Sequence, residues 1–202
     1  MAARVVEQGS PEWKAERTGK MNASTISVWE GKHPYMKPED EVRAQVRALS
    51  GAPSEFELGK NQTTLDIIQY GTDMEDTARK WFEKEYNKTV WEAGGETHPD
   101  YPFLRASPDG LVDLDAIVEF KVRKPKNRNG KANKPYSVFD PSKIMYYYQI
   151  QMNLEVFDRD LCYFVCYISP ESTHVDIVHR EPNWLQQSVP ADLLPKPGSD
   201  HE

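Results

Sequence analysis

The sequence predicts an α/β fold in which helices pack on a mixed central sheet. Helical patterns fill the chain up to residue 87, short β-prone runs follow, and a further helix precedes two more strands. The 202 residues suffice for one medium-sized domain, and aromatic residues at 11% supply much of the bulk of a core. We expect a single domain over 1–189 and a flexible, Pro-rich tail over 190–202.

The first half of the chain carries four helical patterns. Pro11 follows Ser10, which places a favourable first helical residue after a favourable N-cap. In the longest pattern apolar residues recur at helical spacing, and Gly71 indicates a bend within it. We therefore expect helices at 11–18, 23–30, 38–50 and 63–87.

The second half contains short β-prone runs separated by turn residues. A helical pattern returns only from Ser142 to Phe157. Cys162 and Cys166 lie in an apolar run, so we expect buried thiols in a reducing cytoplasm rather than a disulfide framework. Strands are expected at 89–93, 103–106, 116–121, 162–168 and 174–179.

Charge and hydropathy exclude several classes of protein. The net charge of −7 argues against a histone-like nucleic-acid binder, although an enzyme whose carboxylates hold metal ions remains compatible with it. No apolar run approaches the ~20 residues that span a bilayer, so we expect no membrane protein. The first residues lack the apolar core of a signal peptide, which favours a cytoplasmic protein.

The most informative motif is Ser-Pro-Asp-Gly at 107–110, followed by the strand pattern Ile-Val-Glu-Phe-Lys. Glu119 and Lys121 are two residues apart on this strand and project from one face, and a hairpin would bring Asp109 near Glu119. Converging carboxylates repel each other without a cation, and their oxygens suit Mg²⁺ or Mn²⁺. An adjacent ammonium could orient or deprotonate a water, or stabilise a phosphorane. This chemistry is metal-assisted phosphodiester hydrolysis; the alternative is a solvated surface pair.

These motifs resemble the phage lambda exonuclease family, which belongs to the PD-(D/E)xK nucleases with a restriction-endonuclease-like core. The similarity extends from about Trp13 to Ile168 and rests on four separated motifs in the same order. Besides the acidic motif, they are Trp13 and Arg17 with Asn-Ala-Ser at 22–24, Tyr-Gly-Thr-Asp-Met-Glu at 70–75, and Tyr146 with Gln-Ile-Gln at 149–151. Four ordered motifs are more specific than any one of them.

The resemblance implies a role for each matching residue. The metal ligands would be Asp109, Glu119, the backbone carbonyl of Phe120 and, directly or through water, Glu75. The catalytic lysine would be Lys121. The pocket for a 5′-terminal phosphate would be formed by Arg17, Ser24, Ser107 and Gln149. Ile68 falls where the family places an apolar residue that separates the last base pair.

The residues alone leave blander alternatives for several of these roles. Arg17 and Ser24 also fit an exposed arginine and a helix N-cap. Gln149 lies on a polar helix stripe with Ser142, Tyr146 and Asn153, and such a stripe is equally typical of a solvated face. Glu75 stands on a helix among several other acids, which fits a plain acidic face.

The segment after Lys121 is basic, in contrast to the rest of the chain. Residues 121–134 include seven basic residues and no acid. A basic loop beside a catalytic strand could hold the DNA backbone, although a solvated loop is the alternative. The DNA-binding candidates there are Arg123, Lys124, Lys126 and Arg128. The region 31–60 does not align with the family, so residues that guide DNA there stay unassigned.

The family resemblance implies a function as well as a site. We expect a Mg²⁺-dependent 5′-to-3′ exonuclease on double-stranded DNA, with two ions bound and Mn²⁺ able to substitute. It would release mononucleotides and leave 3′ single strands for recombination. Expected partners are DNA ends, two further copies in a trimeric ring, and a single-strand annealing protein in a bacterial host. The alternatives are an endonuclease on the same core and a non-cleaving DNA-end-binding scaffold.

Overall fold

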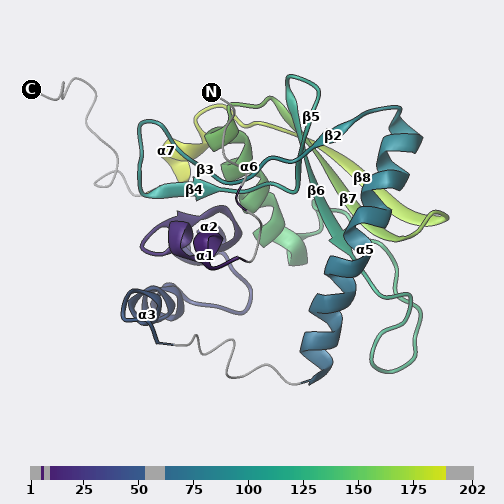
Figure 1. The fold of residues 1–202 in the computed structure, drawn as a ribbon, viewed down its shortest axis with the longest axis horizontal. Helices are drawn as coiled ribbons and strands as arrows, with labels where there is room; N and C mark the ends of the chain where they lie inside the picture. The colour runs from purple at the N-terminus through teal and green to yellow at the C-terminus, as the bar shows by residue number, and fades with distance from the viewer. Residues whose placement is uncertain (1–5, 7–9, 53–61, 190–202) are drawn as a thin grey trace, which may run out of the picture.

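The computed structural model describes residues 6, 10–52 and 62–189, and a five-stranded sheet lies at its centre (Figure 1). The strands follow the order β2-β5-β6-β7-β8. They are β2 (Val90–Trp91), β5 (Gly110–Val112), β6 (Ala116–Val122), β7 (Leu161–Ser169) and β8 (Ser172–His179). Neighbours are antiparallel except β6 and β7, which are parallel. The predicted mixed sheet flanked by helices is therefore confirmed.

Two helices cover the two faces of this sheet. They are α5 (Gln62–Tyr86) and α6 (Ile144–Phe157). Alternation along β6 explains the arrangement: Val118 and Phe120 share a buried cluster with Phe82 of α5, whereas Ile117 shares one with Ile150 of α6. Because parallel strands need a crossover connection, α6 joins β6 to β7. Side chains of β6 that alternate with Phe120 consequently face α6.

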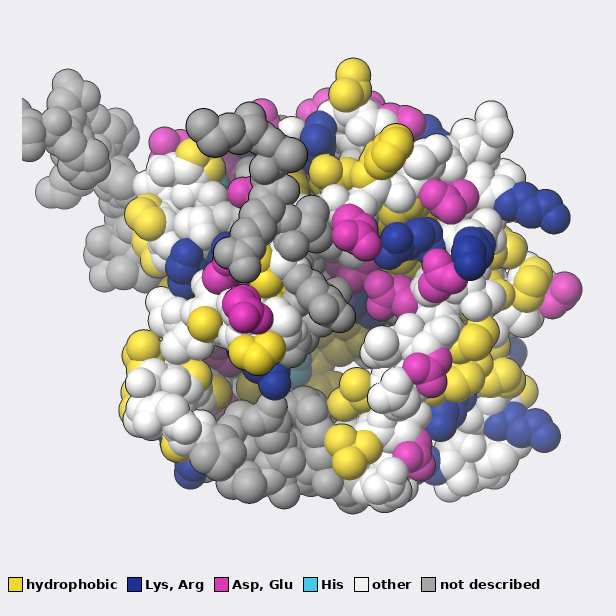
Figure 2. All heavy atoms as spheres, in the orientation of Figure 1, with side chains coloured by type: hydrophobic (Ala, Val, Ile, Leu, Met, Phe, Trp, Pro, Cys, Tyr) yellow, Lys and Arg dark blue, Asp and Glu magenta, His cyan; other side chains and the backbone are white. Residues whose placement is uncertain are grey.

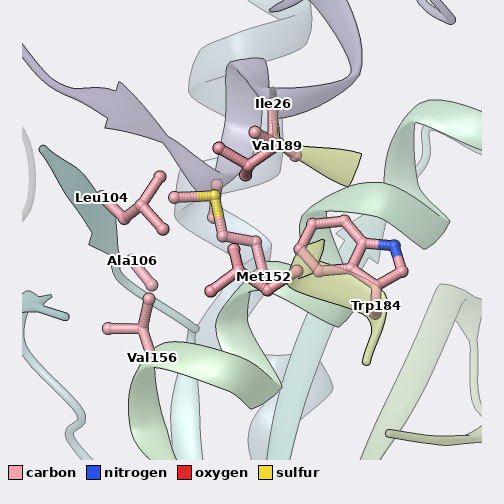
Figure 3. Close-up of a cluster of buried hydrophobic side chains, with 9 residues drawn as sticks. Ile26, Leu104, Ala106, Met152, Val156, Trp184 and Val189 are labelled. Carbon is pink, nitrogen blue, oxygen red and sulfur yellow. The ribbon is translucent and has the colours of Figure 1, made fainter. Parts of the chain in front are cut away.

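A smaller sheet and the N-terminal helices pack on the far side of α6. This sheet has the order β1-β4-β3, with β1 at Met21–Asn22, β4 at Leu104–Ala106 and β3 at Glu96–Thr97. The remaining helices are α1 (Pro11–Arg17), the 3₁₀ turns η1 (Ala23–Thr25) and η2 (Pro141–Lys143), α2 (Ile26–Trp29), α3 (Pro38–Leu49) and α7 (Trp184–Ser188). Ile26, Leu104, Met152 and Trp184 come from four of these elements and form one buried cluster (Figure 3).

Most predicted elements are present, with corrections. The segment expected as one helix over 23–30 divides into η1 and α2. The helix α5 continues through Gly71 without interruption, so the bend expected there does not divide it. The strands β1, β3 and β5, each two or three residues long, were not expected. Cys162 and Cys166 are buried free thiols, as expected.

The expected flexible tail over 190–202 lies outside the described residues, so the domain boundary at 189 stays a prediction. Among the described residues, no helix combines the length and the apolar character that crossing a membrane requires.

Candidate active site

The hairpin of β5 and β6 brings Asp109 beside the strand that carries Glu119. Asp109 directly precedes β5, and Gly110 is paired with Val118 across the hairpin. The backbone N–H of Phe120 donates a hydrogen bond of 2.7 Å to Oδ2 of Asp109. This contact between a turn residue and the next strand holds the Asp109 carboxylate at the edge of β6, as the motif predicted.

Gly110 allows this arrangement because a side chain would not fit there. A Cβ on Gly110 would lie 2.3 Å from Cγ1 of Val90 and 3.2 Å from the carbonyl oxygen of Trp91, both on β2. The glycine that follows Asp109 therefore lets β2 and β5 pair closely. Glycine is required at position 110 because its neighbours pack closely, and not because the backbone there adopts an unusual angle.

Glu119 is buried, 1% exposed, and both of its carboxylate oxygens accept hydrogen bonds. Lys121 Nζ and Gln149 Nε2 each lie 2.6 Å from Oε1. Asn153 Nδ2 lies 3.3 Å from Oε2. Gln149 and Asn153 of the polar stripe therefore face the acidic motif, whereas Ser142 is exposed in η2. Tyr146 of the same stripe places its ring 5.1 Å from Lys121 Nζ.

Burial and mutual repulsion shift the pKa values of these acids. Burial, followed by the charge of Asp109, raises the pKa of Glu119 to about 7. Burial also raises the pKa of Asp109, although the charge of Lys121 opposes it. For Lys121 burial lowers the pKa, but the charges of Glu119 and Asp109 outweigh that effect and leave it above its ordinary value. The single ammonium of Lys121 therefore does not fully neutralise the two carboxylates of Asp109 and Glu119.

Glu75 belongs to the same electrostatic cluster although it lies on α5. Burial, followed by the charge of Asp109, raises its pKa to about 7, and the charge of Arg79 opposes the increase. Arg79 also opposes the rise in the pKa of Asp109. Arg79 was not among the expected site residues, although it lies four residues after Glu75 on the same helix face. That spacing was the available signal.

The predicted phosphate-binding residues lie on the other side of the same space. Arg17 Nη2 donates a 2.7 Å hydrogen bond to Ser24 Oγ, and the guanidinium lies 4.2 Å from the centre of the Trp13 ring. Burial, followed by the charge of Arg105, lowers the pKa of Arg17 to about 10, so the group stays cationic at neutral pH. The hydroxyl of Ser107 donates a 3.0 Å hydrogen bond to the carbonyl of Gly94.

One cavity of about 260 Å³ joins these two sides. Its lining consists of Trp13, Arg17, Ala23, Ser24, Glu75, Ser107, Asp109, Glu119, Phe120, Lys121 and Gln149. Every residue expected to bind metal or the terminal phosphate, together with the expected catalytic lysine, is therefore at one place. These residues come from α1, η1, α5, the turn before β5, β6 and α6, so only the folded chain assembles them.

The acidic residues of this cavity fit a magnesium ion through two carboxylates. Asp109 and Glu119 are held side by side at a cost that a bound cation would remove, as their raised pKa values indicate. Mg²⁺ commonly takes one or two carboxylates and completes its shell with water and substrate phosphate. Within the part of the chain that the structure describes, no three His, Cys, Asp or Glu side chains form a metal-binding group. Glu75 lines the same cavity, and its expected part in holding metal, directly or through water, stays a prediction.

The basic segment after Lys121 lines a second cavity of about 480 Å³. Arg123, Lys124, Lys126 and Arg128 all line it, opposite Ile67 and neighbouring residues of α5. Arg123 is anchored within the loop, because its Nη2 donates a 3.1 Å hydrogen bond to Asn133 Oδ1. Lys126 and Arg128 are exposed. Figure 2 shows basic and acidic side chains interspersed on the right-hand part of one face. The net negative charge of the chain is therefore not spread evenly over its surface.

Ile68, the expected wedge residue, lies on the N-terminal half of α5. It is 43% exposed and does not line either of these cavities. An exposed apolar side chain at this place is compatible with the role that the resemblance implies, and the role stays a prediction.

The fold matches that of solved exonuclease structures. The chain superposes on the alkaline exonuclease LHK-Exo from Laribacter hongkongensis with a TM-score of 0.68 and 24% identity, covering 88% of this chain and 86% of that one. It matches a phage related exonuclease from Haemophilus somnus 129PT with a TM-score of 0.59 and 16% identity, covering 84% and 87%. At these identities the similarity establishes the shared fold.

Residues 12–160 match the YqaJ-like viral recombinase domain, and the chain belongs to this family. The expected membership among phage recombination exonucleases is thereby confirmed. The chain is also 25% identical over 187 residues to the uncharacterized protein R354 of Acanthamoeba polyphaga mimivirus, a match that covers 85% of this chain. It spans 31% of the length of that relative.

Proposed function

We propose that this protein is a Mg²⁺-dependent exonuclease that degrades double-stranded DNA from 5′-phosphorylated ends. It releases mononucleotides and leaves 3′ single strands that recombination can use. The observation that carries the proposal is the cavity that places Asp109, Glu119 and Lys121 beside Arg17 and Ser24. The match to the viral recombinase family supports a role in recombination.

The acidic side of the cavity supplies the chemistry. Asp109 and Glu119 hold the divalent ions, for which Mn²⁺ can substitute, and we expect two ions during the reaction. When bound, such an ion polarises the scissile phosphate and lowers the pKa of a water at its surface. Lys121, which is ion-paired with Glu119, orients the attacking water and neutralises charge that develops on the phosphorane.

The opposite side of the cavity selects the end of the strand. Arg17 presents a planar guanidinium that matches a phosphate, and Ser24 adds a hydroxyl beside it. Ser107 and Gln149 line the same space and complete the set. A doubly charged terminal phosphate gains more from these groups than an internal phosphodiester, so the preference is for a phosphorylated end, and the family resemblance implies the 5′ end.

The experiment compares three duplexes in the presence of Mg²⁺. Linear DNA with 5′-phosphate ends, linear DNA with 5′-hydroxyl ends and closed circular DNA are each end-labelled or stained and followed over time. We expect mononucleotides from the phosphorylated linear duplex, slower release from the hydroxyl form, and no cutting of circles. Chelation of the metal should stop the reaction.

Other results identify the alternative functions. Cutting of closed circles would mean an endonuclease on the same core. Binding of DNA ends without cleavage, in either Mg²⁺ or Mn²⁺, would mean a recombination scaffold. Labels on the 5′ and the 3′ ends of separate substrates decide the polarity, since a label at the attacked end is released first.

Assembly and partnership are further parts of the proposal. The family resemblance implies a trimeric ring around DNA and cooperation with a single-strand annealing protein. Mass measured in solution tests the ring, because a trimer has three times the 23.2 kDa of one chain. Stimulation of strand annealing after resection tests the partnership.

A further inference from the structure

Asn153 is a buried amide that contacts the acidic motif without lining the cavity. It is 0% exposed and lies on α6, one helical turn after Gln149. Its Nδ2 donates a 3.3 Å hydrogen bond to Oε2 of Glu119. A buried asparagine is costly in an apolar core unless it is hydrogen-bonded. The presence of this amide beside Glu119 therefore requires an explanation.

The two oxygens of Glu119 have partners of different kinds. Oε1 accepts from Lys121 and Gln149, and both of these side chains line the cavity. Oε2 accepts from Asn153, which is absent from the lining. Oε1 is therefore the oxygen on the cavity side, and Oε2 is the one on the protein side.

The other atom of the amide shows that this contact dominates the orientation of Asn153. Its Oδ1 is buried and has no hydrogen-bond partner among the described residues. A buried acceptor without a donor destabilises the folded protein. The Asn153 side chain thus leaves Oδ1 without a donor while its Nδ2–H group donates to Glu119. Such an exchange of stability for orientation is typical of groups that support a site.

We propose that Asn153 is a positioning residue that holds Oε2 of Glu119 and so keeps Oε1 turned toward the metal side of the cavity. The inference rests on the proposed function, because it assumes that Glu119 is a metal ligand. Hydrogen bonds to a liganding carboxylate restrict its rotation, and their loss typically weakens metal binding by about 10- to 100-fold. Asn153 touches neither substrate nor metal in this scheme.

Gln151 provides a matched control on the same helix. It is also a 0% exposed amide, two residues before Asn153. Its Nε2 donates to the carbonyl of His179 at 2.8 Å, and its Oε1 accepts from the backbone N–H of Glu181 at 2.9 Å. It therefore ties α6 to the end of β8 and has no contact with Glu119. Replacing either amide by leucine removes one buried polar group from α6.

The test measures binding of Mn²⁺ alone, by electron paramagnetic resonance or calorimetry, on the full chain without DNA. Asn153→Leu should weaken Mn²⁺ binding by about 10- to 100-fold, while Gln151→Leu stays within a factor of 2–3 of the wild type and loses thermal stability instead. In cleavage assays Asn153→Leu should need more metal and recover much of its rate at saturating Mn²⁺. If Asn153→Leu fails to fold, Asn153→Ala is read in the same way.

The inference is overturned if Asn153→Leu binds Mn²⁺ as tightly as the wild type. It is equally overturned if Gln151→Leu weakens binding to the same degree, since packing of α6 would then be the cause. Glu119→Gln separates this failure from failure of the proposed function. If the wild type binds no Mn²⁺, or Glu119→Gln binds it unchanged, the metal site itself is wrong and both proposals fall.

Discussion

The two sides of the cavity are built in different ways. On the acidic side Glu119 is 1% exposed and is held by residues thirty or more positions away on α6. On the phosphate side Arg17 bonds to Ser24 only seven residues away, and α1 contains no buried residue. The core of the fold therefore positions the groups for chemistry, whereas a short local segment at its surface positions Arg17 and Ser24, two of the groups for end recognition. The two tasks should be separable by mutation.

The largest expected effect is that of Lys121→Ala. Loss of the ammonium should reduce the cleavage rate by about 10²- to 10⁴-fold while DNA binding stays largely intact. Quench-flow or gel assays with labelled linear duplex measure the rate, and filter binding in a metal-free buffer measures affinity. Lys84→Ala, an exposed lysine of α5, is the matched control. If Lys121→Ala lost DNA binding and cleavage rate to a comparable degree, chemistry and DNA recognition would not be separable by mutation.

The buried acids should also make the metal-free protein less stable as pH rises. Glu119 has a pKa raised from 4.5 to about 7 in the folded state, so folding is favoured by its protonated form. Its contribution is fully present below pH 4.5 and is lost as pH rises to about 7. The loss should amount to about 1–3 kcal/mol of unfolding free energy.

Chemical denaturation between pH 4 and pH 8 with a chelator present measures this effect. Glu119→Gln should show a flatter profile than the wild type, and Glu85→Gln, which changes an exposed acid of α5, should not. Saturating Mg²⁺ should restore the stability of the wild type at pH 8. A profile that is the same for the wild type and Glu119→Gln would argue against the electrostatic account of the acidic side.

Arg17→Ala should have an effect of intermediate size, confined to end recognition. Loss of a charge-assisted contact of about 1.5–3 kcal/mol should raise KM for 5′-phosphorylated DNA by roughly 10- to 100-fold. The preference over 5′-hydroxyl ends should shrink with it, while kcat changes less. Arg43→Ala, an exposed arginine of α3, serves as the control. A fall in kcat with unchanged KM would mean that the two sides of the cavity are not independent.

The smallest effect is expected from the loop that follows β6. Replacing Lys126 and Arg128 by glutamine should weaken DNA binding several-fold. It should also reduce the slope of the logarithm of the DNA-binding constant against the logarithm of salt concentration by up to about 2. For each phosphate contact that is lost, roughly 0.9 fewer counterions are released when the protein binds DNA. Titrations at several salt concentrations measure the slope. An unchanged slope would mean that this loop is solvated and does not touch DNA.

The long helices and the acidic motif could be predicted from sequence because their signals are local. Ser10 before Pro11 marked the start of α1, and the spacing of Glu119 and Lys121 placed both on one face of β6. The alternation of side chains on a strand depends only on the strand itself. The fold class followed from the order of such elements.

The polar stripe of α6 shows where local signals end. Periodicity placed Gln149 and Asn153 on one face, but it could not distinguish a solvated face from one that contacts Glu119. That distinction depends on which strand packs beneath the helix. The roles in phosphate binding came from family resemblance rather than from the residues.

The absence of a side chain at Gly110 has a consequence for how this protein tolerates change. Strand β5 is three residues long, and its pairing with β2 leaves no space for even one methyl group at Gly110. The carboxylate of Asp109 sits immediately before that narrow point, so any enlargement there displaces it first. Natural or engineered variation at this position should therefore lower both turnover and the melting temperature, because overpacking so close a contact costs about 1–3 kcal/mol.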